Sequence, residues 1–415
     1  MGMDTNLAVA DLGYRSRTAC MHCGGGLDTV LDLGKIVVSD FPRPTTPDPL
    51  TMPLSLLWCD ACHFVQLGQI VDDTTLYTEY LYRSGIIETM RAELADIVKT
   101  ALAIVPEPKG VLDVGANDGT LLSHYPLGVH RIAVEPASNL FEAVARQAHV
   151  VLTGFFPTTT YYLPEKSVDI CTTIAMFYDL EDPVSAVVEI DRLLTADGVW
   201  IVQLQDLAQQ VATTAFDNVC FEHRGYYSLE TFEHLLKGID LHVVDVQKRQ
   251  INGGSYRIIL RRRKHPEYGA CLAVLNWEQQ YTSYDALTKF AWRVEQVRTQ
   301  IQAVVSESLL RGPVDLYAAS TKSSTLMQYC GFDATLIRQA VERTQEKVGR
   351  VTTGTRIPIV SEDTWRADPA PTTLLGAWSF AEAFCAREAD YLQQGGVFVQ
   401  PLPRPTLISW EGKGR

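Results

Sequence analysis

Four cysteines have the spacing of metal ligands because they fall in two C-x-x-C pairs: Cys20, Cys23, Cys59 and Cys62. Each pair lets two thiolates approach one tetrahedral ion, and two pairs complete an all-sulfur shell with no open position for water. This pattern predicts a structural Zn²⁺ site rather than a catalytic one. Unrelated thiols or a redox C-x-x-C motif are the alternative, but neither pair stands between a strand and a helix. We expect the neighbouring His22 and His63 to be bystanders.

A second group of residues could bind a nucleoside cofactor at a glycine-containing turn: Asp113, Gly115, Asn117, Asp118 and Gly119. The turn follows an apolar strand and precedes a helix, where backbone N–H groups face a ligand. About 20 residues on, Glu135 ends the next strand, where a carboxylate accepts hydrogen bonds from ribose hydroxyls. The turn lacks G-x-G-x-x-G and is acidic, so it favours S-adenosylmethionine over NAD. A turn that only packs is the alternative.

The surrounding sequence predicts the elements that position these groups. Short apolar runs broken by Pro and Gly predict small strands and a zinc-ribbon-like module over residues 1–75. Helical spacing from Glu88 to about Val105 leads into alternating strands and helices up to residue 265, which is typical of a parallel Rossmann-like sheet. We expect two strands, in LHVVDVQK and SYRIILRRR, to finish that sheet as a hairpin at its antiparallel edge. Residues 266–415 start with a helical connector and continue as a further α/β domain.

Composition excludes several classes of function for this α/β chain. The 415 residues are 46% hydrophobic and 20% charged, which suffices for several folded cores. The net charge of −13 opposes binding to nucleic acid or to an anionic membrane surface. No apolar run has the length of a membrane helix and the first residues lack a signal-peptide pattern, so we expect a cytoplasmic protein. The sequence carries no signal for an oligomeric state.

Several motifs resemble those of the sugar C-methyltransferase family. They are the two cysteine pairs, the DVGANDG turn and the segments TEYLYRSG, FEHRGYYS, NGGSYRI, STKSSTLMQYCG and GTRIPIVS. The resemblance covers nearly the whole chain and implies a zinc module, a class I methyltransferase core and a C-terminal α/β domain. It also implies methyl transfer from S-adenosylmethionine to a carbon of a nucleotide-linked deoxysugar, next to a keto group.

Methylation at such a carbon needs a base, because a proton next to the carbonyl must be removed first. His223 in the FEHRGYYS segment is the candidate base, and we expect its pKa to lie near neutrality. Glu222 is expected to orient the imidazole or to bind a sugar hydroxyl. The segment follows a strand on the ligand side of the sheet. A partly buried histidine with a structural role is the alternative.

Characterised family members carry a tyrosine where this chain has Cys220, so a phenol that could take part in proton transfer or stabilise the enolate is missing at this position. Either another tyrosine supplies the phenol or the sugar differs from the well-known deoxysugars. The candidate tyrosines are Tyr77, Tyr80, Tyr82, Tyr226 and Tyr227. Tyr82 is assigned to the cofactor and catalytic site, Tyr226 to catalysis and Tyr227 to the substrate. Packing roles for these rings are the alternative, and Cys220 is interpreted as a small buried thiol.

The C-terminal domain is expected to bind the nucleotide of the substrate. Lys322 lies among hydroxyl residues between a predicted strand and a helix, where a pyrophosphate could bind, and Asn252 in the NGG turn could contact the sugar. Residues other than glycine stand where many family members have glycine: Ala318, Ala319 and Ser323. The basic run 347–356 is interpreted as a solvated surface loop.

The combined prediction is an S-adenosylmethionine-dependent C-methyltransferase with structural zinc. It acts on a nucleotide-linked keto-deoxysugar through an enolate, with His223 as the general base. Two other functions stay open at this point. One is O- or N-methylation of a sugar or small metabolite by the same fold, and the other is an interaction protein whose methyltransferase core has lost activity.

Overall fold

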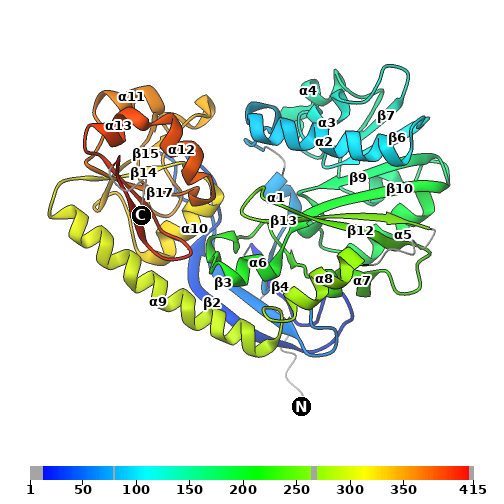
Figure 1. Ribbon diagram of the computed structural model, residues 1–415, viewed down its shortest axis with the longest axis horizontal. Helices are drawn as coiled ribbons and strands as arrows, with labels where there is room; N and C mark the ends of the chain where they lie inside the picture. The colour runs from blue at the N-terminus through cyan, green and yellow to red at the C-terminus, as the bar shows by residue number, and fades with distance from the viewer. Residues whose placement is uncertain (1–12, 78–79, 263–268, 411–415) are drawn as a thin grey trace, which may run out of the picture.

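The computed structural model describes residues 13–77, 80–262 and 269–410. The strands of these residues form sheets of two, four, seven and six strands. Figure 1 shows the seven-stranded sheet in cyan and green on one side and the six-stranded sheet, with its orange and red helices, on the other. The blue strands β2 and β3 lie below and between them.

The N-terminal module consists of short antiparallel strands. In β3 every second residue from Met52 to Trp58 is buried, as expected for a strand with one face on a core. β1 pairs with β5, while β2, β3 and β4 form a sheet that β11, from the middle of the chain, extends by one strand. The strands are β1 (Tyr14–Ser16), β2 (Leu27–Val37), β3 (Thr51–Cys59), β4 (Val65–Leu67), β5 (Gln69–Val71) and β11 (Gly225–Tyr226).

The middle sheet has the strand order β12-β13-β10-β9-β6-β7-β8. β13 runs antiparallel to both of its neighbours, β10 and β12. The expected hairpin at this end of the sheet is confirmed, and its strand β13 lies one place inside the edge strand β12. The reason is burial: all but the last residue of β13 are buried, whereas β12 is mostly half-exposed and suits the edge.

The elements around this sheet alternate along the chain as the sequence predicted. The strands are β6 (Gly110–Val114), β7 (His130–Val134), β8 (Val150–Leu152), β9 (Val168–Ile174), β10 (Leu194–Gln205), β12 (His242–Arg249) and β13 (Ser255–Arg261). The helices are α1 (Asp73–Tyr77), α2 (Glu88–Ile104), α3 (Thr120–Ser123), α4 (Phe141–Ala145), α5 (Pro183–Leu193), α6 (Leu207–Ala212) and α7 (Leu229–Leu235), with a 3₁₀ turn η4 (Phe177–Asp179) after β9.

The C-terminal sheet is parallel except for its last strand and has the order β16-β15-β14-β17-β18-β19. Its strands are β14 (Val314–Tyr317), β15 (Ile337–Glu342), β16 (Ile359–Ser361), β17 (Thr372–Leu375), β18 (Val397–Gln400) and β19 (Thr406–Ile408). The helices from residue 269 on are α8 (Gly269–Glu278), α9 (Tyr284–Leu309), α10 (Thr321–Cys330), α11 (Glu362–Ala367), α12 (Ala381–Arg387) and α13 (Ala389–Gln393). The connector is thus two helices, of which α8 packs on β12 and α7 of the middle domain.

One hydrophobic core crosses all three parts of the chain. It contains Leu54 of β3, Leu207 of α6 and Val294 of α9, each at most 2% exposed. The long helix α9 and the first helix of the C-terminal sheet, α10, both pack against β2. The N-terminal module therefore lies at the junction of the two larger sheets and fixes their relative position.

Candidate functional site

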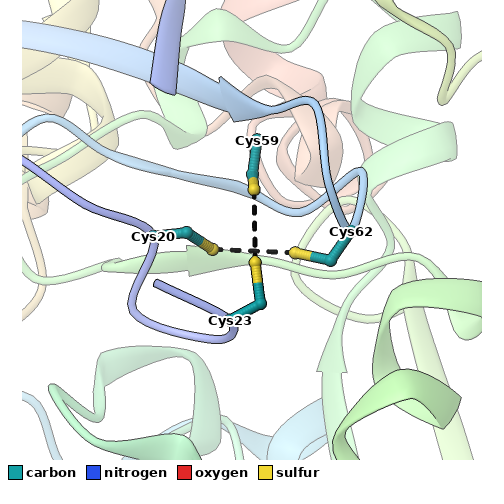
Figure 2. Close-up of side chains that lie close together, drawn as sticks. All are labelled: Cys20, Cys23, Cys59 and Cys62. Carbon is teal, nitrogen blue, oxygen red and sulfur yellow. Dashed lines mark hydrogen bonds between the residues drawn. The ribbon is translucent and has the colours of Figure 1, made fainter. Parts of the chain in front are cut away.

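The two cysteine pairs converge on one point, as Figure 2 shows. Their sulfur atoms all lie within 4.8 Å of one another, with 3.6 Å between Cys20 Sγ and Cys62 Sγ and 3.4 Å between Cys23 Sγ and Cys59 Sγ. Sulfurs bound to one tetrahedral zinc at about 2.3 Å are about 3.8 Å apart, so the cluster fits this ion. The four cysteines hold a structural zinc ion. The ring of His63 stacks on Trp58 instead, with 5.1 Å between ring centroids.

The predicted cofactor turn lies at the carboxyl end of β6 and is organised by Glu135. Gly115 has a φ of +71°, and a Cβ there would lie 2.8 Å from Met176 Cγ, so the position requires glycine. Glu135 accepts the N–H of Asn117 at 2.7 Å through Oε2 and that of Ala137 at 2.9 Å through Oε1. Each oxygen keeps a second lone pair for a ligand hydroxyl. Burial raises the pKa of this carboxyl group.

Asp113, the last residue but one of β6, is also buried beside this turn. Its Oδ1 accepts the hydroxyl hydrogen of Thr172 on β9 at 2.6 Å. Burial raises the pKa of Asp113 to about 7, and the negative charge of Glu135 adds to the effect. A positively charged ligand group is the natural partner for such a pair of carboxyl groups.

Asp118 and Gly119 do not line the cavity next to this turn. The Oδ2 atom of Asp118 accepts the N–H of Gly85 at 2.8 Å, so this carboxylate holds the segment that follows the tyrosines. Gly119 has a φ of +79°, and a Cβ there would come within 2.9 Å of Gln147 Cβ. The structure therefore gives both residues a positioning role behind the turn.

One cavity of about 870 Å³ connects the cofactor turn with the rest of the site. It is lined by Asp113 to Asn117 and Glu135, by the loop carrying Glu222 and His223, and by Lys322 of the C-terminal domain. Pockets for one small ligand range from roughly 300 to 1,000 Å³. This cavity is near the upper end of that range, so it can take a cofactor together with a second molecule.

His223 lies in this cavity as a neutral imidazole. Its Nδ1 is 3.0 Å from the carbonyl oxygen of Asn218. Because a carbonyl oxygen only accepts, Nδ1 carries the hydrogen and Nε2 keeps a free lone pair. Burial and the ammonium group of Lys322 lower the pKa of His223 to about 3, well below the predicted near-neutral value. The ring of Tyr178 packs edge-on against the imidazole at 4.5 Å.

Two carboxyl groups line the cavity beside His223. Glu222 Oε1 accepts a long hydrogen bond of 3.4 Å from the Thr321 hydroxyl, while its buried Oε2 has no hydrogen-bond partner among the described residues. Asp179, the last residue of η4, also has a buried and unpartnered oxygen, Oδ1. Burial raises the pKa of both groups. Asp179 was not predicted, although its place just after a parallel strand was a usable signal.

The tyrosines of the TEYLYRSG segment and of α1 line the cavity next to these carboxyl groups. The rings of Tyr80 and Tyr82 are 6.4 Å apart, and those of Tyr77 and Tyr80 are 5.9 Å apart. The Tyr77 hydroxyl donates to the Glu222 carbonyl oxygen at 3.2 Å. Burial raises the pKa of Tyr82 to about 12, so its hydroxyl stays protonated. These phenols face the same space as His223.

Tyr226 and Tyr227, predicted as a catalytic and a substrate residue, are not among the cavity-lining residues. Tyr226 belongs to β11 and lies in the core shared by the three parts of the chain. Tyr227 is 1% exposed and packs on Phe64 and Phe177 at 4.8 and 5.7 Å. The correction has a simple cause: pairing of β11 with β4 directs both rings into hydrophobic cores.

Lys322 and Asn252 both line the cavity and contact each other, although the sequence had indicated separate roles for them. Lys322 Nζ donates to the Asn252 carbonyl oxygen at 2.8 Å, and burial lowers the pKa of this lysine. The hydroxyls near it are already engaged, because Ser320 and Ser323 form the capping box of α10. A ligand phosphate beside α10 would therefore be met by the Lys322 ammonium and by Thr321.

The basic run 347–356 is not the solvated loop that was expected. Lys347 lines the cavity and donates to the Ala319 carbonyl oxygen at 2.8 Å. Arg356 donates to the Thr46 carbonyl oxygen at 3.0 Å, so the run packs on the N-terminal module. Burial in this contact explains the difference, since composition alone does not reveal which charged loop is covered.

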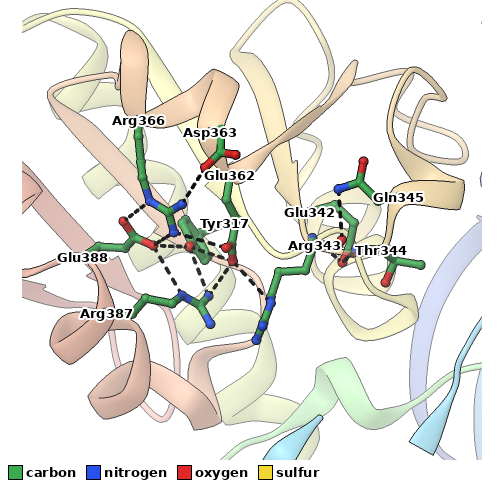
Figure 3. Close-up of polar contacts among 10 residues, drawn as sticks. All are labelled: Tyr317, Glu342, Arg343, Thr344, Gln345, Glu362, Asp363, Arg366, Arg387 and Glu388. Atoms are coloured by element: carbon green, nitrogen blue, oxygen red, sulfur yellow. Dashed lines mark hydrogen bonds and ion pairs between the residues drawn. The ribbon is translucent and has the colours of Figure 1, made fainter. Parts of the chain in front are cut away.

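An ion-pair network forms the cavity wall on the C-terminal side, around β14, α11 and α12 (Figure 3). Arg387 Nη2 lies 2.8 Å from Glu362 Oε1 and donates to the Tyr317 hydroxyl at 3.1 Å. All three side chains line the cavity. This wall therefore offers fixed donors and acceptors to a polar ligand.

The described part of the chain contains no helix with the length and apolar character needed to cross a membrane. Three family models match it in succession: a zinc binding domain at residues 20–77, a methyltransferase domain at 86–246 and a C-methyltransferase C-terminal domain at 250–403. The chain is 28% identical over 379 residues to the C-methyltransferase NovU of Streptomyces niveus, covering 86% of this chain and 88% of that protein.

Two solved methyltransferase structures match part of the chain. A methyltransferase of Thermotoga maritima, described as a possible histamine N-methyltransferase, is 20% identical and has a TM-score of 0.33, over 42% of this chain and 89% of its own. The 1,6-didemethyltoxoflavin-N1-methyltransferase of Burkholderia thailandensis is 15% identical with a TM-score of 0.32, over 42% of this chain and 78% of its own. The three family models in chain order, the four-cysteine cluster and the similarity to NovU along most of the length show that the chain is an S-adenosylmethionine-dependent methyltransferase with structural zinc.

Proposed function

We propose that this protein methylates a ring carbon next to the keto group of a nucleotide-linked deoxysugar in the cytoplasm. The similarity to the C-methyltransferase NovU supports transfer to carbon. A zinc site made only of cysteines suits a reducing compartment.

The observation that carries the proposal is the shared cavity. It gives the cofactor turn, a neutral imidazole and a buried ammonium group one common space of about 870 Å³. Glu135 and Asp113 would hold the cofactor, which supplies an activated methyl group when bound. Lys322 suits the diphosphate of a nucleotide sugar, and Asn252, whose carbonyl oxygen orients that lysine at 2.8 Å, lies beside it.

His223 is the proposed general base. Its Nε2 lone pair accepts the proton from the carbon beside the ketone, and the C–H electron pair forms a carbon–carbon double bond while the carbonyl π pair moves to oxygen. The carbon then takes the methyl group as the carbonyl re-forms, and the electron pair of the broken sulfur–methyl bond would stay on the sulfur of the leaving S-adenosylhomocysteine. His223 releases its proton to water, so no oxidant or reductant is needed. Asn218 keeps the ring in the required tautomer by accepting from Nδ1 at 3.0 Å.

The low pKa of His223 fits this role once the substrate is bound. Burial is the largest cause of the low pKa of His223, and the positive charge of Lys322 is the second. A diphosphate next to Lys322 neutralises that charge, so the imidazole gains proton affinity when the substrate arrives. The Glu222 carboxyl group, with its unpartnered Oε2, is the proposed acceptor for a sugar hydroxyl.

Exchange of a ring proton for deuterium tests the proposal. The protein is incubated in D₂O with S-adenosylhomocysteine and a panel of thymidine- and cytidine-diphosphate 4-keto-deoxysugars, and the sugar protons are followed by NMR. We expect exchange at one carbon next to the ketone, and we expect His223→Gln to abolish it without changing affinity for S-adenosylhomocysteine. The control is His124→Gln, because His124 is an exposed histidine outside the cavity.

Two results would contradict the proposal. Absence of exchange with every sugar, despite cofactor binding, would point to O- or N-methylation. Full exchange in His223→Gln would remove His223 as the base.

A further inference from the structure

Asp179 lines the cavity, and the proposed methyl-transfer reaction does not yet assign a role to its carboxyl group. It ends η4, the short turn at the carboxyl end of β9, and one of its oxygens, Oδ1, is buried without a hydrogen-bond partner among the described residues. Buried polar atoms without partners are rare in folded proteins and point to a missing ligand atom. The Asp179 carboxyl group is thus placed for contact with a bound molecule.

The surroundings place Asp179 next to the proposed base. Its neighbour Tyr178 packs on the His223 ring at 4.5 Å, and the Tyr178 carbonyl oxygen accepts the N–H of Arg224 at 2.8 Å. Residues 178 and 179 are therefore fixed to the loop 222–224 by one backbone hydrogen bond and one ring contact. The carboxyl group and the imidazole line the same cavity from adjacent segments.

The charges around Asp179 favour its protonated form. Glu222 faces it from the His223 loop and Asp73 from α1, and both repel a second negative charge. The facing cation is Arg224, which is already paired with Asp73 at 2.6 Å. Tyr77, Tyr80 and Cys220 are the other titratable groups near it, and burial raises the pKa of each, so they stay neutral. Burial is the largest cause that raises the pKa of Asp179 well above its ordinary value, and the negative charge of Glu222 is the next.

We propose that Asp179 is a neutral acid that donates a hydrogen bond to the ketone oxygen of the substrate and stabilises the enolate. The inference rests on the proposed function and adds a second reacting group to it. As His223 takes the carbon-bound proton, negative charge develops on the ketone oxygen, and the Asp179 O–H shares its hydrogen with that oxygen. The hydrogen returns fully to Asp179 when the carbonyl re-forms, so the residue is unchanged after each turnover. A carboxylic acid kept neutral by an apolar site can serve as such a donor.

The test compares Asp179→Leu with Asp179→Asn in the deuterium-exchange assay, using S-adenosylhomocysteine and the most reactive 4-keto-deoxysugar. Removing one donor to a developing oxyanion slows a reaction roughly 100- to 1,000-fold, which is the loss expected for Asp179→Leu. An asparagine amide still donates, so Asp179→Asn is expected within about tenfold of the wild type. The control is Asp285→Asn at the exposed start of α9, which should not change the rate.

The pH profile separates this role from a purely structural one. Because an acid donor fails when it ionises, the wild-type exchange rate should fall at high pH, and Asp179→Asn should lose that descending limb. Binding of S-adenosylhomocysteine by calorimetry shows that each variant is folded.

Each result has a distinct meaning. Equal rates in the wild type and Asp179→Leu would overturn the inference and leave the proposed function standing. Equal inactivity of both Asp179 variants would also overturn it, because Asp179 would then act as a base. Absence of exchange in the wild type would instead refute the proposed function itself.

Discussion

The role of Glu135 gives the sharpest prediction for the cofactor end of the site. Its two oxygens accept the N–H groups of Asn117 and Ala137 at 2.7 and 2.9 Å, and thereby fix the turn after β6. In Glu135→Gln the side chain keeps one accepting oxygen and turns an NH₂ group toward the other N–H. The NH₂ group also cannot accept a cofactor hydroxyl, so one charge-assisted hydrogen bond to the bound ligand is lost, which costs about 1.5–3 kcal/mol. The expected result is a dissociation constant for S-adenosylhomocysteine that rises roughly 10- to 150-fold.

Isothermal titration calorimetry with purified S-adenosylhomocysteine measures this change directly. Glu142→Gln is the matched control, because that side chain is 89% exposed on α4 and should leave the affinity unchanged. A thermal transition close to that of the wild type would show that Glu135→Gln is folded. An affinity within twofold of the wild type would refute the reasoning, because the Glu135 carboxylate would then make no hydrogen bond to the ligand.

The zinc site and Asp113 give two further predictions. Cys59→Ser should lose stoichiometric zinc, measured by elemental mass spectrometry, and should unfold at a lower temperature, whereas Cys330→Ser, outside the cluster, should keep its zinc. The pKa of Asp113 is about 7 in the folded state, against an ordinary value of 3.8. The folded state therefore binds the proton more tightly, and the free energy of unfolding falls as pH rises from about 4 to about 7. Asp113→Asn has no proton to lose, so its melting temperature relative to the wild type should be higher at pH 8 than at pH 5; an equal difference at both pH values would contradict the assignment.

Local patterns predicted much of this molecule, and tertiary contacts decided the rest. The cysteine pairs and the glycine turn were predictable, because their ligands and geometry lie within a few residues of one another. The directions of the Tyr226 and Tyr227 rings were not predictable, because they depend on the pairing of β11 with β4, a strand of the N-terminal module. Burial of Lys347 likewise depends on contact with the N-terminal module. Asp179 was missed because no motif marks it, and only its position in the folded sheet gives it a function.

The two-residue strand β11 determines whether the middle domain can function without the N-terminal module. β11 begins two residues after His223 and completes the sheet of the N-terminal module by pairing with β4. β4 in turn begins three residues after Cys62, the last zinc ligand. A polypeptide trimmed to the middle sheet would therefore lose the partner strand that holds the histidine loop, while keeping its cofactor turn. Such a fragment should bind S-adenosylhomocysteine and fail in proton exchange. The smallest unit expected to carry the full chemistry is then the three-part chain, because the histidine loop depends on a strand of the N-terminal module.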